Sequence, residues 1–302
     1  KLAISKKAHF VSSSYISPEM RNLNDAALEA EVSLVNEIGL DPGIDHLMAH
    51  KLVEEFKKSE LINAETAVSF LSYCGGVPKT PNEFKYKFSW SPLGVLKALK
   101  SPSRSIKEFK NFEVKRPWDA ITSYNAPLKN PEEFEVYPNR DSLPFIEQYD
   151  FDHNWKIKHF VRGTLRLKGW TDAWSEIFNE IETLNGEAGE RRLIEMSEQF
   201  WKDNAYSENE PDRVILCVDL KAEQNNHIMW HKTYKMDAWG DERGTAMARL
   251  VSYPVSFAIK AIIDNQIEYG VSAAASKPNL VEKWLQDISG LAQEFNIIDH
   301  VV

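Results

Sequence analysis

Two arginine-containing segments and one acidic turn hold the side chains best suited to bind a polar ligand. Tyr137-Pro-Asn-Arg-Asp141 and Arg162-Gly-Thr-Leu-Arg166 each place an arginine beside turn residues or on a strand. If the segments converge on one cleft, their guanidinium groups can bind two carboxylates in a bidentate manner. The alternative is ordinary surface arginines paired with neighbours such as Asp141. Spacing alone favours that alternative, because isolated surface ion pairs are the usual case.

The acidic turn lies in Leu34-Val-Asn-Glu-Ile-Gly-Leu-Asp-Pro-Gly-Ile-Asp-His46, where a strand-like apolar run is followed by a helical one. Asp41 before Pro42 predicts a helix N-cap with proline at the first helical position. A strand that ends in this turn brings carboxylates, including Glu37 and Asp45, to the carboxyl edge of a sheet. Ligands bind at that edge in open α/β folds. The alternative is a capped helix with no further role.

Cysteine and histidine spacing gives weaker signals. Cys74 precedes Gly75-Gly76 and is either a reactive thiol or, more commonly for a free cysteine, a small buried side chain. His46 and His50 are one helical turn apart, but no glutamate completes a metal-binding motif, so we expect no metal. The two cysteines form no disulfide framework and no zinc spacing, and we expect a reducing, cytoplasmic setting.

The composition argues against several classes of partner. The 302 residues carry a formal net charge of −9 at pH 7 and are 43% hydrophobic, and the pI is about 5.5. This acidic balance argues against nucleic acid or an anionic membrane surface as the main partner. We find no signal peptide and no apolar run as long as a membrane span.

The order of predicted elements is typical of an α/β protein with two sheets. Predicted strands at 9–14 and 32–38 flank a helical segment at βαβ spacing, so we expect them to be parallel neighbours. No G-x-G-x-x-G turn is present to bind a dinucleotide phosphate. From about 65 to 237, short alternating strands predict a second, mostly antiparallel sheet, whose clearest hairpin joins 213–222 to 227–236.

Two helices are predicted near the end of the chain. One runs over 243–263 and is interrupted by Pro254, and the last covers 278–295. His227 and His231 alternate on one face of the predicted hairpin, where we expect both to be solvated.

Six segments in the first 170 residues carry a family resemblance. They are Ser13-Ser-Tyr-Ile-Ser-Pro18, Asn36-Glu-Ile-Gly-Leu-Asp-Pro-Gly-Ile-Asp-His46, Ser72-Tyr-Cys-Gly-Gly-Val-Pro78, Tyr86-Lys-Phe-Ser-Trp-Ser-Pro92, Tyr137-Pro-Asn-Arg-Asp-Ser142 and Arg162-Gly-Thr-Leu-Arg166. In this order they resemble saccharopine dehydrogenase of the L-glutamate-forming type, also called saccharopine reductase. Asp241-Glu-Arg-Gly-Thr-Ala-Met-Ala248 and Pro254 are similar to the closing helix of that family. The resemblance implies that cofactor-binding strands and a glycine turn, the N-terminal cofactor-binding half, precede Lys1.

The resemblance implies an α/β fold with two unequal parts. One is a remnant of a Rossmann-like parallel sheet, and the other is a larger α+β catalytic domain with a mostly antiparallel mixed sheet. Residues 1–41 would be the C-terminal part of an NAD(P)-binding domain, and residues 42–240 the catalytic and substrate domain. Residues 241–302 would be closing helices that pack back toward the cofactor domain.

The resemblance also implies a reaction, the interconversion of saccharopine with L-glutamate and aminoadipate semialdehyde by hydride transfer at a C–N bond. The cofactor would be NADP or NAD, and water would hydrolyse the imine. Saccharopine has three carboxylates and two nitrogens, so it needs arginines, hydroxyls and a carboxylate around it. The expected partner is therefore a small molecule, and the resemblance leaves room for a homodimer.

Individual roles follow from the same resemblance. The expected catalytic residues are Tyr15, Asp41 and Cys74. The expected substrate-binding residues are Ser14, Tyr15, Asp41, Arg140, Thr164, Leu165 and Arg166. The expected cofactor contacts are Ser13, Ser14, Leu40, Asp41, Pro42 and Ser91.

Two alternatives stay open. One is another imine reductase with the same fold, such as a carboxyspermidine-type dehydrogenase, whose polyamine conjugate would need more acidic groups and fewer arginines. The other is a non-catalytic binding relative that lacks the cofactor half.

Overall fold

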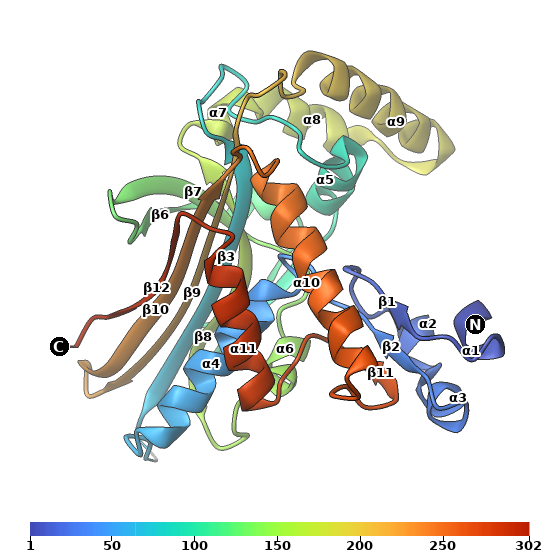
Figure 1. Cartoon of the computed structure of the whole chain (residues 1–302). Helices are drawn as coiled ribbons and strands as arrows, with labels where there is room; N and C mark the ends of the chain where they lie inside the picture. The colour runs from blue at the N-terminus through green and yellow to red at the C-terminus, as the bar shows by residue number, and fades with distance from the viewer. Residues whose placement is uncertain (64, 302) are drawn as a thin grey trace.

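The chain builds two β-sheets, of which the smaller is parallel. In the computed structural model, which describes residues 1–63 and 65–301, its strand order is β1-β2-β11. These strands are β1 (Phe10–Val11), β2 (Ser33–Val35) and β11 (Gly270–Ser272), and they lie beside the short helices α1 (Leu2–Ser5), α2 (Pro18–Arg21) and α3 (Asn24–Glu29) (Figure 1). The predicted parallel pairing of the first two strands is confirmed, although both strands are shorter than predicted.

The larger sheet has nine strands in the order β12-β10-β9-β3-β8-β4-β5, with β7 pairing both β6 and β8. The β3–β8 pairing is parallel and the other described pairings are antiparallel, so the predicted second sheet is confirmed. Its strands are β3 (Ala67–Pro78), β4 (Ser103–Lys107), β5 (Lys110–Val114), β6 (Thr122–Ala126), β7 (Glu132–Pro138), β8 (Lys156–Leu167), β9 (Asp212–Gln224), β10 (His227–Trp239) and β12 (Glu294–Asp299).

The C-terminal part corrects two predictions. The final helix is shorter than predicted: α11 covers Pro278–Ser289, and the chain then pairs with β10 as β12. The closing segment therefore adds β11 to the small sheet and β12 to the large sheet, and does not consist of helices alone. The proposed domain boundaries after residues 41 and 240 stay predictions.

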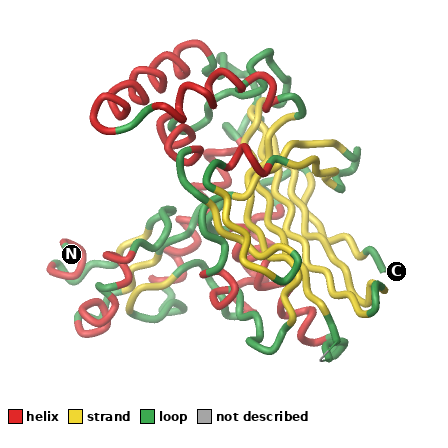
Figure 2. The backbone as a smooth tube through the Cα atoms, turned by 180° about the vertical axis from the view of Figure 1, so that it is seen from behind, coloured by secondary structure: helices red, strands yellow, loops and turns green. Residues whose placement is uncertain are grey.

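Three helices cover one face of the large sheet (Figure 1). They are α4 (Ile44–Lys58), α10 (Ala246–Ile263) and α11. The apolar side of α4, including Leu52 and Phe56, packs into one core with inward-facing strand residues such as Leu220. From behind, the strands lie in front of these helices (Figure 2). The main core is therefore between this helical layer and the sheet.

Helix α10 corrects the expectation that no segment has the apolar length of a membrane span. By length and composition alone, α10 is long and apolar enough to cross a membrane, with a mean hydropathy of 1.4 over 18 residues. The helix contains Arg249, Pro254 and Lys260, and Leu250, Ala258 and Ala261 on it are buried in the main core. Buried core helices of globular proteins also reach this length and hydropathy.

A second, aromatic core lies at one end of the large sheet, around Trp170, Trp174, Tyr86 and Phe88. The helices in this region are α5 (Pro92–Leu99), α7 (Trp170–Ala173), α8 (Ser175–Thr183) and α9 (Gly186–Asp203), and elsewhere the 3₁₀ helix η1 (Pro117–Ala120) and α6 (Pro144–Gln148) connect strands. This core holds the start of α5 beside the cavity described next.

Candidate active site

A cavity of about 540 Å³ lies where the carboxyl ends of the small sheet meet the large sheet. Segments far apart in sequence contribute to it: the turns after β1 and β2, strands β3 and β8, the end of β7 and the first turns of α5 and α10. Its lining includes Ser13, Ser14, Tyr15, Leu40, Asp41, Pro42, Cys74, Gly76, Tyr137, Arg140, Thr164, Arg166, Met247 and Val251. The two arginine segments and the acidic turn therefore do converge on one site.

Arg166 is the most unusual group in this cavity. Its side chain is buried, and its guanidinium lies 4.8 Å from the ring centre of Tyr86 and 5.3 Å from that of Trp170. Its Nη1 donates a hydrogen bond to the Leu165 carbonyl, but its Nε–H is buried with no partner among the described residues. No carboxylate in the described ranges forms an ion pair with it. A buried cation without a counter-ion is costly, so the site favours an anionic ligand.

Arg140 lies at the exposed side of the same cavity, with its guanidinium 5.5 Å from the ring centre of Tyr15. It too forms no ion pair with any carboxylate that the structure describes. Thr164 is two residues before Arg166 and thus on the same face of β8. The cavity therefore presents two guanidinium groups and a hydroxyl that are free to meet a ligand.

At the inner end of the cavity, Asp41 belongs to a buried ion network. Its Oδ1 accepts hydrogen bonds from Arg162 Nη2 at 2.5 Å and from the Tyr15 hydroxyl at 3.2 Å. The same Arg162 nitrogen donates to Asp45 Oδ2 at 2.6 Å. His46 continues the network, with its Nε2 3.1 Å from Glu37 Oε2. The three carboxylates of Glu37, Asp41 and Asp45 therefore contact only one arginine and one histidine in this network, so negative groups outnumber positive ones.

In this network the pKa values of Asp41 and Asp45 are shifted in opposite directions. Burial raises the pKa of Asp41, and the negative charge of Asp45 raises it further against the opposing effect of Arg162. Burial would also raise the pKa of Asp45, but His46, Arg162 and the Gly43 N–H lower it below its ordinary value. The aspartate that faces the cavity is therefore the one that takes up a proton more readily.

The predicted helix cap at Asp41 is wrong. The N-cap residue is Gly43, and the helix begins at Ile44, so Pro42 precedes the helix. Gly43 has a φ of +149°, and an added Cβ would lie 2.1 Å from the Gly39 carbonyl oxygen, so only glycine fits this turn. The Asp45 carboxylate accepts the Gly43 N–H at 2.6 Å. Asp41 is thereby released from capping and is available to the cavity.

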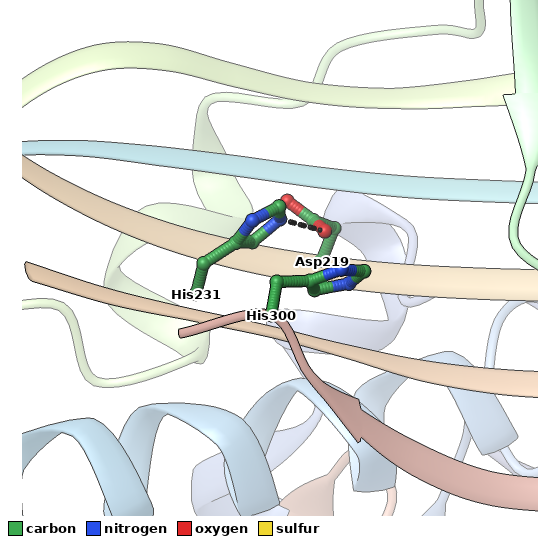
Figure 3. A group of neighbouring side chains, drawn as sticks. All are labelled: Asp219, His231 and His300. Atoms are coloured by element: carbon green, nitrogen blue, oxygen red, sulfur yellow. Dashed lines mark hydrogen bonds and ion pairs between the residues drawn. The ribbon is translucent and has the colours of Figure 1, made fainter. Parts of the chain in front are cut away.

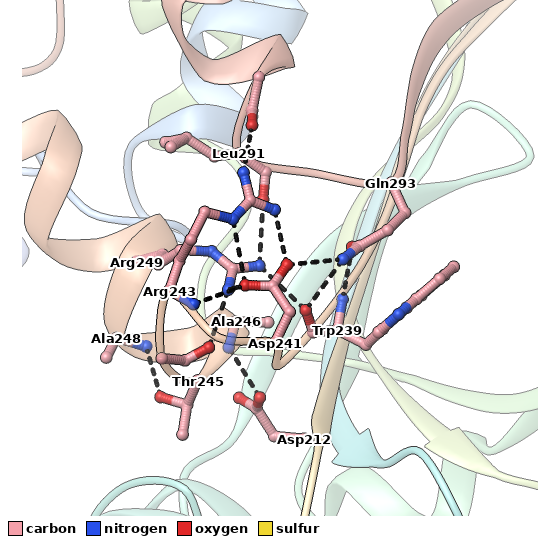
Figure 4. A network of polar contacts seen from close by, with 12 residues as sticks. Asp212, Trp239, Asp241, Arg243, Thr245, Ala246, Ala248, Arg249, Leu291 and Gln293 are labelled. Atoms are coloured by element: carbon pink, nitrogen blue, oxygen red, sulfur yellow. Dashed lines mark hydrogen bonds and ion pairs between the residues drawn. The ribbon is translucent and has the colours of Figure 1, made fainter. Parts of the chain in front are cut away.

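A second network fixes the helix that brings Met247 and Val251 to the cavity (Figure 4). The Asp241 carboxylate accepts hydrogen bonds from Arg243 Nη2 at 2.6 Å and Arg249 Nη1 at 2.8 Å. The two oxygens of the Asp212 carboxylate accept the first backbone N–H groups of α10, those of Ala246 and Met247. The start of α10 is thus held against the end of β10.

A family model supplies the identification. Residues 39–290 match the model described as the saccharopine dehydrogenase C-terminal domain. The chain belongs to the saccharopine dehydrogenase family. The resemblance inferred from the six segments is thereby confirmed.

Curated relatives match different shares of the chain. A saccharopine dehydrogenase [NADP(+), L-glutamate-forming] from Pyricularia oryzae is 42% identical over 173 residues, which are 56% of this chain and 37% of that protein. The enzyme of the same name from Saccharomyces cerevisiae is 29% identical over 96% of this chain and 79% of its own length. Mitochondrial alpha-aminoadipic semialdehyde synthase from Mus musculus is 26% identical over 89% of this chain, with 35% of that protein covered. The chain thus matches little more than a third of the length of the Pyricularia oryzae and Mus musculus proteins.

Solved structures agree on the fold. Apo saccharopine dehydrogenase (L-Glu forming) from Saccharomyces cerevisiae has a TM-score of 0.76 and 26% identity over 98% of this chain and 80% of that one. A homospermidine synthase from Legionella pneumophila in complex with NAD has a TM-score of 0.59 over 99% of this chain and 72% of its own. At 9% identity the second likeness shows a shared fold alone.

Two expected site residues lie elsewhere. Leu165 is buried on the opposite face of β8, in a cluster with Val77 and Phe134, because strand side chains alternate. Ser91 caps α5, where its hydroxyl accepts the Gly94 N–H, and the neighbouring Trp90 lines the cavity instead. The other expected residues line the cavity, and their roles in this family member stay predictions.

Cys74 lines the cavity but is poorly suited to act as a nucleophile. Burial raises the pKa of its thiol well above the ordinary value, and the neighbouring carboxylates of Asp41 and Asp45 raise it further. The thiol therefore stays protonated, whereas the thiolate is the reactive form. The structure favours the alternative of a small buried side chain.

The reasoning from sequence missed Arg162 as a site residue and did not connect Glu37, Asp45 and His46 to it. A period-two pattern could have found the arginine, because Arg162, Thr164 and Arg166 share one face of β8. No local pattern pairs this arginine with Asp45, 117 residues earlier.

The residues present fit part of a nicotinamide cofactor. Ser13 and Ser14 follow β1, and Leu40 follows β2, so two hydroxyl groups and one apolar side chain line the cavity beyond the carboxyl ends of parallel strands. Dinucleotides bind at such an edge. The described residues contain no glycine-rich turn at a helix N-terminus that could hold a pyrophosphate. They therefore fit the nicotinamide end of the cofactor alone.

Proposed function

We propose that this chain forms the substrate-binding part of a nicotinamide-dependent oxidoreductase of lysine metabolism. The proposed reaction is the interconversion of saccharopine with L-glutamate and aminoadipate semialdehyde, with NADP or NAD as cofactor. The observation that carries the proposal is a cavity with two arginines that have no carboxylate partner among the described residues, beside an aspartate with a raised pKa. The relatives named saccharopine dehydrogenase [NADP(+), L-glutamate-forming] support the same reaction.

The arginines suit the anionic ends of saccharopine. Tyr86 and Trp170 hold the Arg166 guanidinium in place, so little conformational entropy is lost when it binds a carboxylate. Arg140, at the exposed side, is placed to bind a second carboxylate as the ligand enters. A polyamine conjugate carries fewer carboxylates than saccharopine. The presence of both Arg140 and Arg166 in the cavity therefore favours saccharopine over the carboxyspermidine-type alternative.

Asp41 suits the secondary amine of saccharopine. The amine must lose its proton before its lone pair can assist loss of hydride from the neighbouring carbon, and the Asp41 carboxylate can hold that proton. When bound, the cofactor would accept the hydride. Water then adds to the resulting iminium carbon, and cleavage of the C–N bond releases glutamate and the aldehyde. The Tyr15 hydroxyl, bonded to Asp41, keeps the carboxylate oriented toward the cavity.

The experiment compares Arg166→Lys and Arg140→Lys with the parent in the complete protein. Lysine keeps the charge and loses the bidentate fork, so we expect KM for saccharopine to rise about tenfold or more while KM for the nucleotide stays near the parent value. Arg192→Lys is the control, because Arg192 lies on α9 and already pairs with Glu180. Calorimetric titration of saccharopine without nucleotide should show the same loss of affinity.

Two results would contradict the proposal. One is an equal change in both Michaelis constants for Arg166→Lys. The other is saccharopine binding that matches the parent in both cavity variants.

A further inference from the structure

A second cavity, of about 650 Å³, lies on the other face of the large sheet. Its lining residues Leu71, Asp219 and Thr233 alternate along their strands with residues such as Leu220 and Tyr234, which pack in the core beneath α4. The sheet therefore lies between this cavity and the candidate active site, and Tyr137 on β7 borders both cavities. The proposed function uses none of its residues.

Asp219, His231 and His300 meet at one side of this cavity (Figure 3). Each offers one ligand atom, and the three atoms lie within 4.8 Å of one another. His231 Nε2 is 2.7 Å from Asp219 Oδ2, and the two imidazole rings are stacked with their centres 4.1 Å apart. The expectation that His231 is simply solvated is therefore wrong.

The sheet register explains why these residues meet. Thr233 on β10 stands directly opposite Asp219 on β9, and His231 is two residues earlier on the same face. The His300 backbone N–H donates to the His231 carbonyl at 2.9 Å, so the residue after β12 is held beside the hairpin. Two paired strands and the residue that follows a third strand thus bring three potential ligands together.

A bound cation would replace the hydrogen bond between His231 Nε2–H and Asp219 Oδ2, and the Nε2 proton would be released. Thr233 Oγ1 lies 2.6 Å from Asp219 Oδ2 and 2.8 Å from His300 Nε2, and so orients both groups. Asp219 Oδ1 accepts no hydrogen bond within the described ranges. The neighbouring Lys221 and Lys235 have carboxylate partners of their own, Glu223 and Glu294, which reduces their repulsion of a cation.

We propose that Asp219, His231 and His300 form a binding site for a divalent transition-metal ion of the zinc class. Two imidazole nitrogens and one carboxylate oxygen are a common ligand set for Zn²⁺, and water from the cavity would fill the remaining position. Ligand atoms on one tetrahedral zinc are about 3.4 Å apart, as follows from bond lengths near 2.1 Å. The present spacings, from 2.7 Å to no more than 4.8 Å, lie on both sides of this value. The bound ion would join the end of β12 to the β9–β10 hairpin.

The test is calorimetric titration of Zn²⁺ into chelator-treated, complete protein. We expect one site per chain. Each of Asp219→Asn, His231→Gln and His300→Gln should weaken Zn²⁺ binding by about 100-fold or more, because even loss of a residue that only hydrogen-bonds to a metal ligand weakens binding by about 10- to 100-fold. The control is His227→Gln, an exposed histidine on the same strand, which should bind like the parent. Thermal melting should show that Zn²⁺ raises Tm in the parent and not in the three variants.

Cobalt provides a second readout. Co²⁺ in the same site should give visible absorption bands of tetrahedral coordination, and excess Zn²⁺ should remove them. If Asp219→Asn fails to fold, His300→Gln still decides the question, because its side chain is exposed and not part of the core. Saturable binding that survives all three substitutions, binding that falls equally in His227→Gln, or no binding at all would overturn the proposal and leave a hydrogen-bonded cluster only.

Discussion

Asp41 and Asp241 are each bonded to one buried arginine, Arg162 and Arg249, yet their carboxyl groups have pKa values shifted in opposite directions. Asp41 shares Arg162 with Asp45, and its pKa is raised by burial. Asp241 has Arg243 and Arg249 to itself, and hydrogen bonds from Arg243, against a smaller effect of burial, lower its pKa.

The difference lies in the number of cationic donors for each carboxylate. Around Asp41 the carboxylates outnumber the cations, so one of them favours a proton or a cationic ligand. Around Asp241 two guanidinium groups surround one carboxylate, so its negative charge is fully satisfied. The first network borders the candidate active site, and the second positions α10. Three substitutions test this contrast.

Arg162→Met should have the largest effect. It leaves the Asp41 and Asp45 carboxylates buried without their shared cation, and breaking a buried ion pair costs about 3–5 kcal/mol. In a domain of this size we expect Tm to fall by roughly 10 °C. Differential scanning calorimetry of the complete protein measures the change.

The control for this prediction is Arg116→Met. Arg116 also pairs with two carboxylates, those of Asp119 and Glu182, but it is half exposed, so its Tm change should be small. Similar melting of the parent and Arg162→Met would show that the buried network contributes little to stability. If Arg162→Met does not fold, Arg162→Lys, which keeps a cation there, should fold with a lower Tm.

Asp41→Asn should separate stability from activity. The raised pKa means that protonated Asp41 stabilises the fold below its ordinary pKa, and that this contribution is lost as the pH rises through the raised folded value. Asparagine is neutral at every pH, so the variant should melt at or slightly above the parent Tm at pH 8. Turnover of saccharopine should nevertheless fall by roughly ten- to a thousandfold, the range for losing one proton-handling group.

Melting curves and steady-state kinetics on one preparation decide this prediction. A marked fall in Tm at pH 8 with unchanged turnover would make Asp41 a structural residue. The proposed proton role would then be lost, while carboxylate binding by Arg140 and Arg166 could still be tested on its own.

Asp241→Asn should lower Tm less than Arg162→Met does, with a pH dependence opposite to that of Asp41→Asn. A lowered pKa contributes stability that is present above the ordinary value of 3.8 and is lost as the pH falls toward the lower folded value. Losing the charged hydrogen bonds costs about 2 kcal/mol, so we expect Tm to fall by roughly 4–8 °C at pH 7. The difference from the parent should shrink as the pH falls below about 4.

Melting across a pH series measures this change. The control is Asp287→Asn, whose single exposed pair with Lys283 should contribute little. A Tm difference for Asp241→Asn that stays constant from pH 7 to pH 3 would contradict the assigned charge state.

The amino-acid sequence by itself determined the local elements and the order of the motifs. The β9–β10 hairpin follows from two alternating segments around Asn225-Asn226, whose positive φ values of 49° and 64° suit a tight turn. The parallel pairing of β1 and β2 follows from the crossover between them. Ten of the expected site residues also line one cavity, because the motifs that carry them lie at strand ends and in turns.

Tertiary structure decided which of these residues act together and what charge they carry. The sequence pattern predicted Asp41 as a helix cap, and the family resemblance placed Leu165 in the substrate site. The Gly43 turn and the alternation of β8 direct these side chains otherwise. The pKa of Asp41 is raised by burial and by the nearby Asp45, against the opposing effect of Arg162. The second cavity joins Asp219 on β9, His231 on β10 and His300, which follows β12. Such groups come together only when sheet register and burial bring distant segments together, because charge interactions depend on distance and desolvation rather than on separation along the chain.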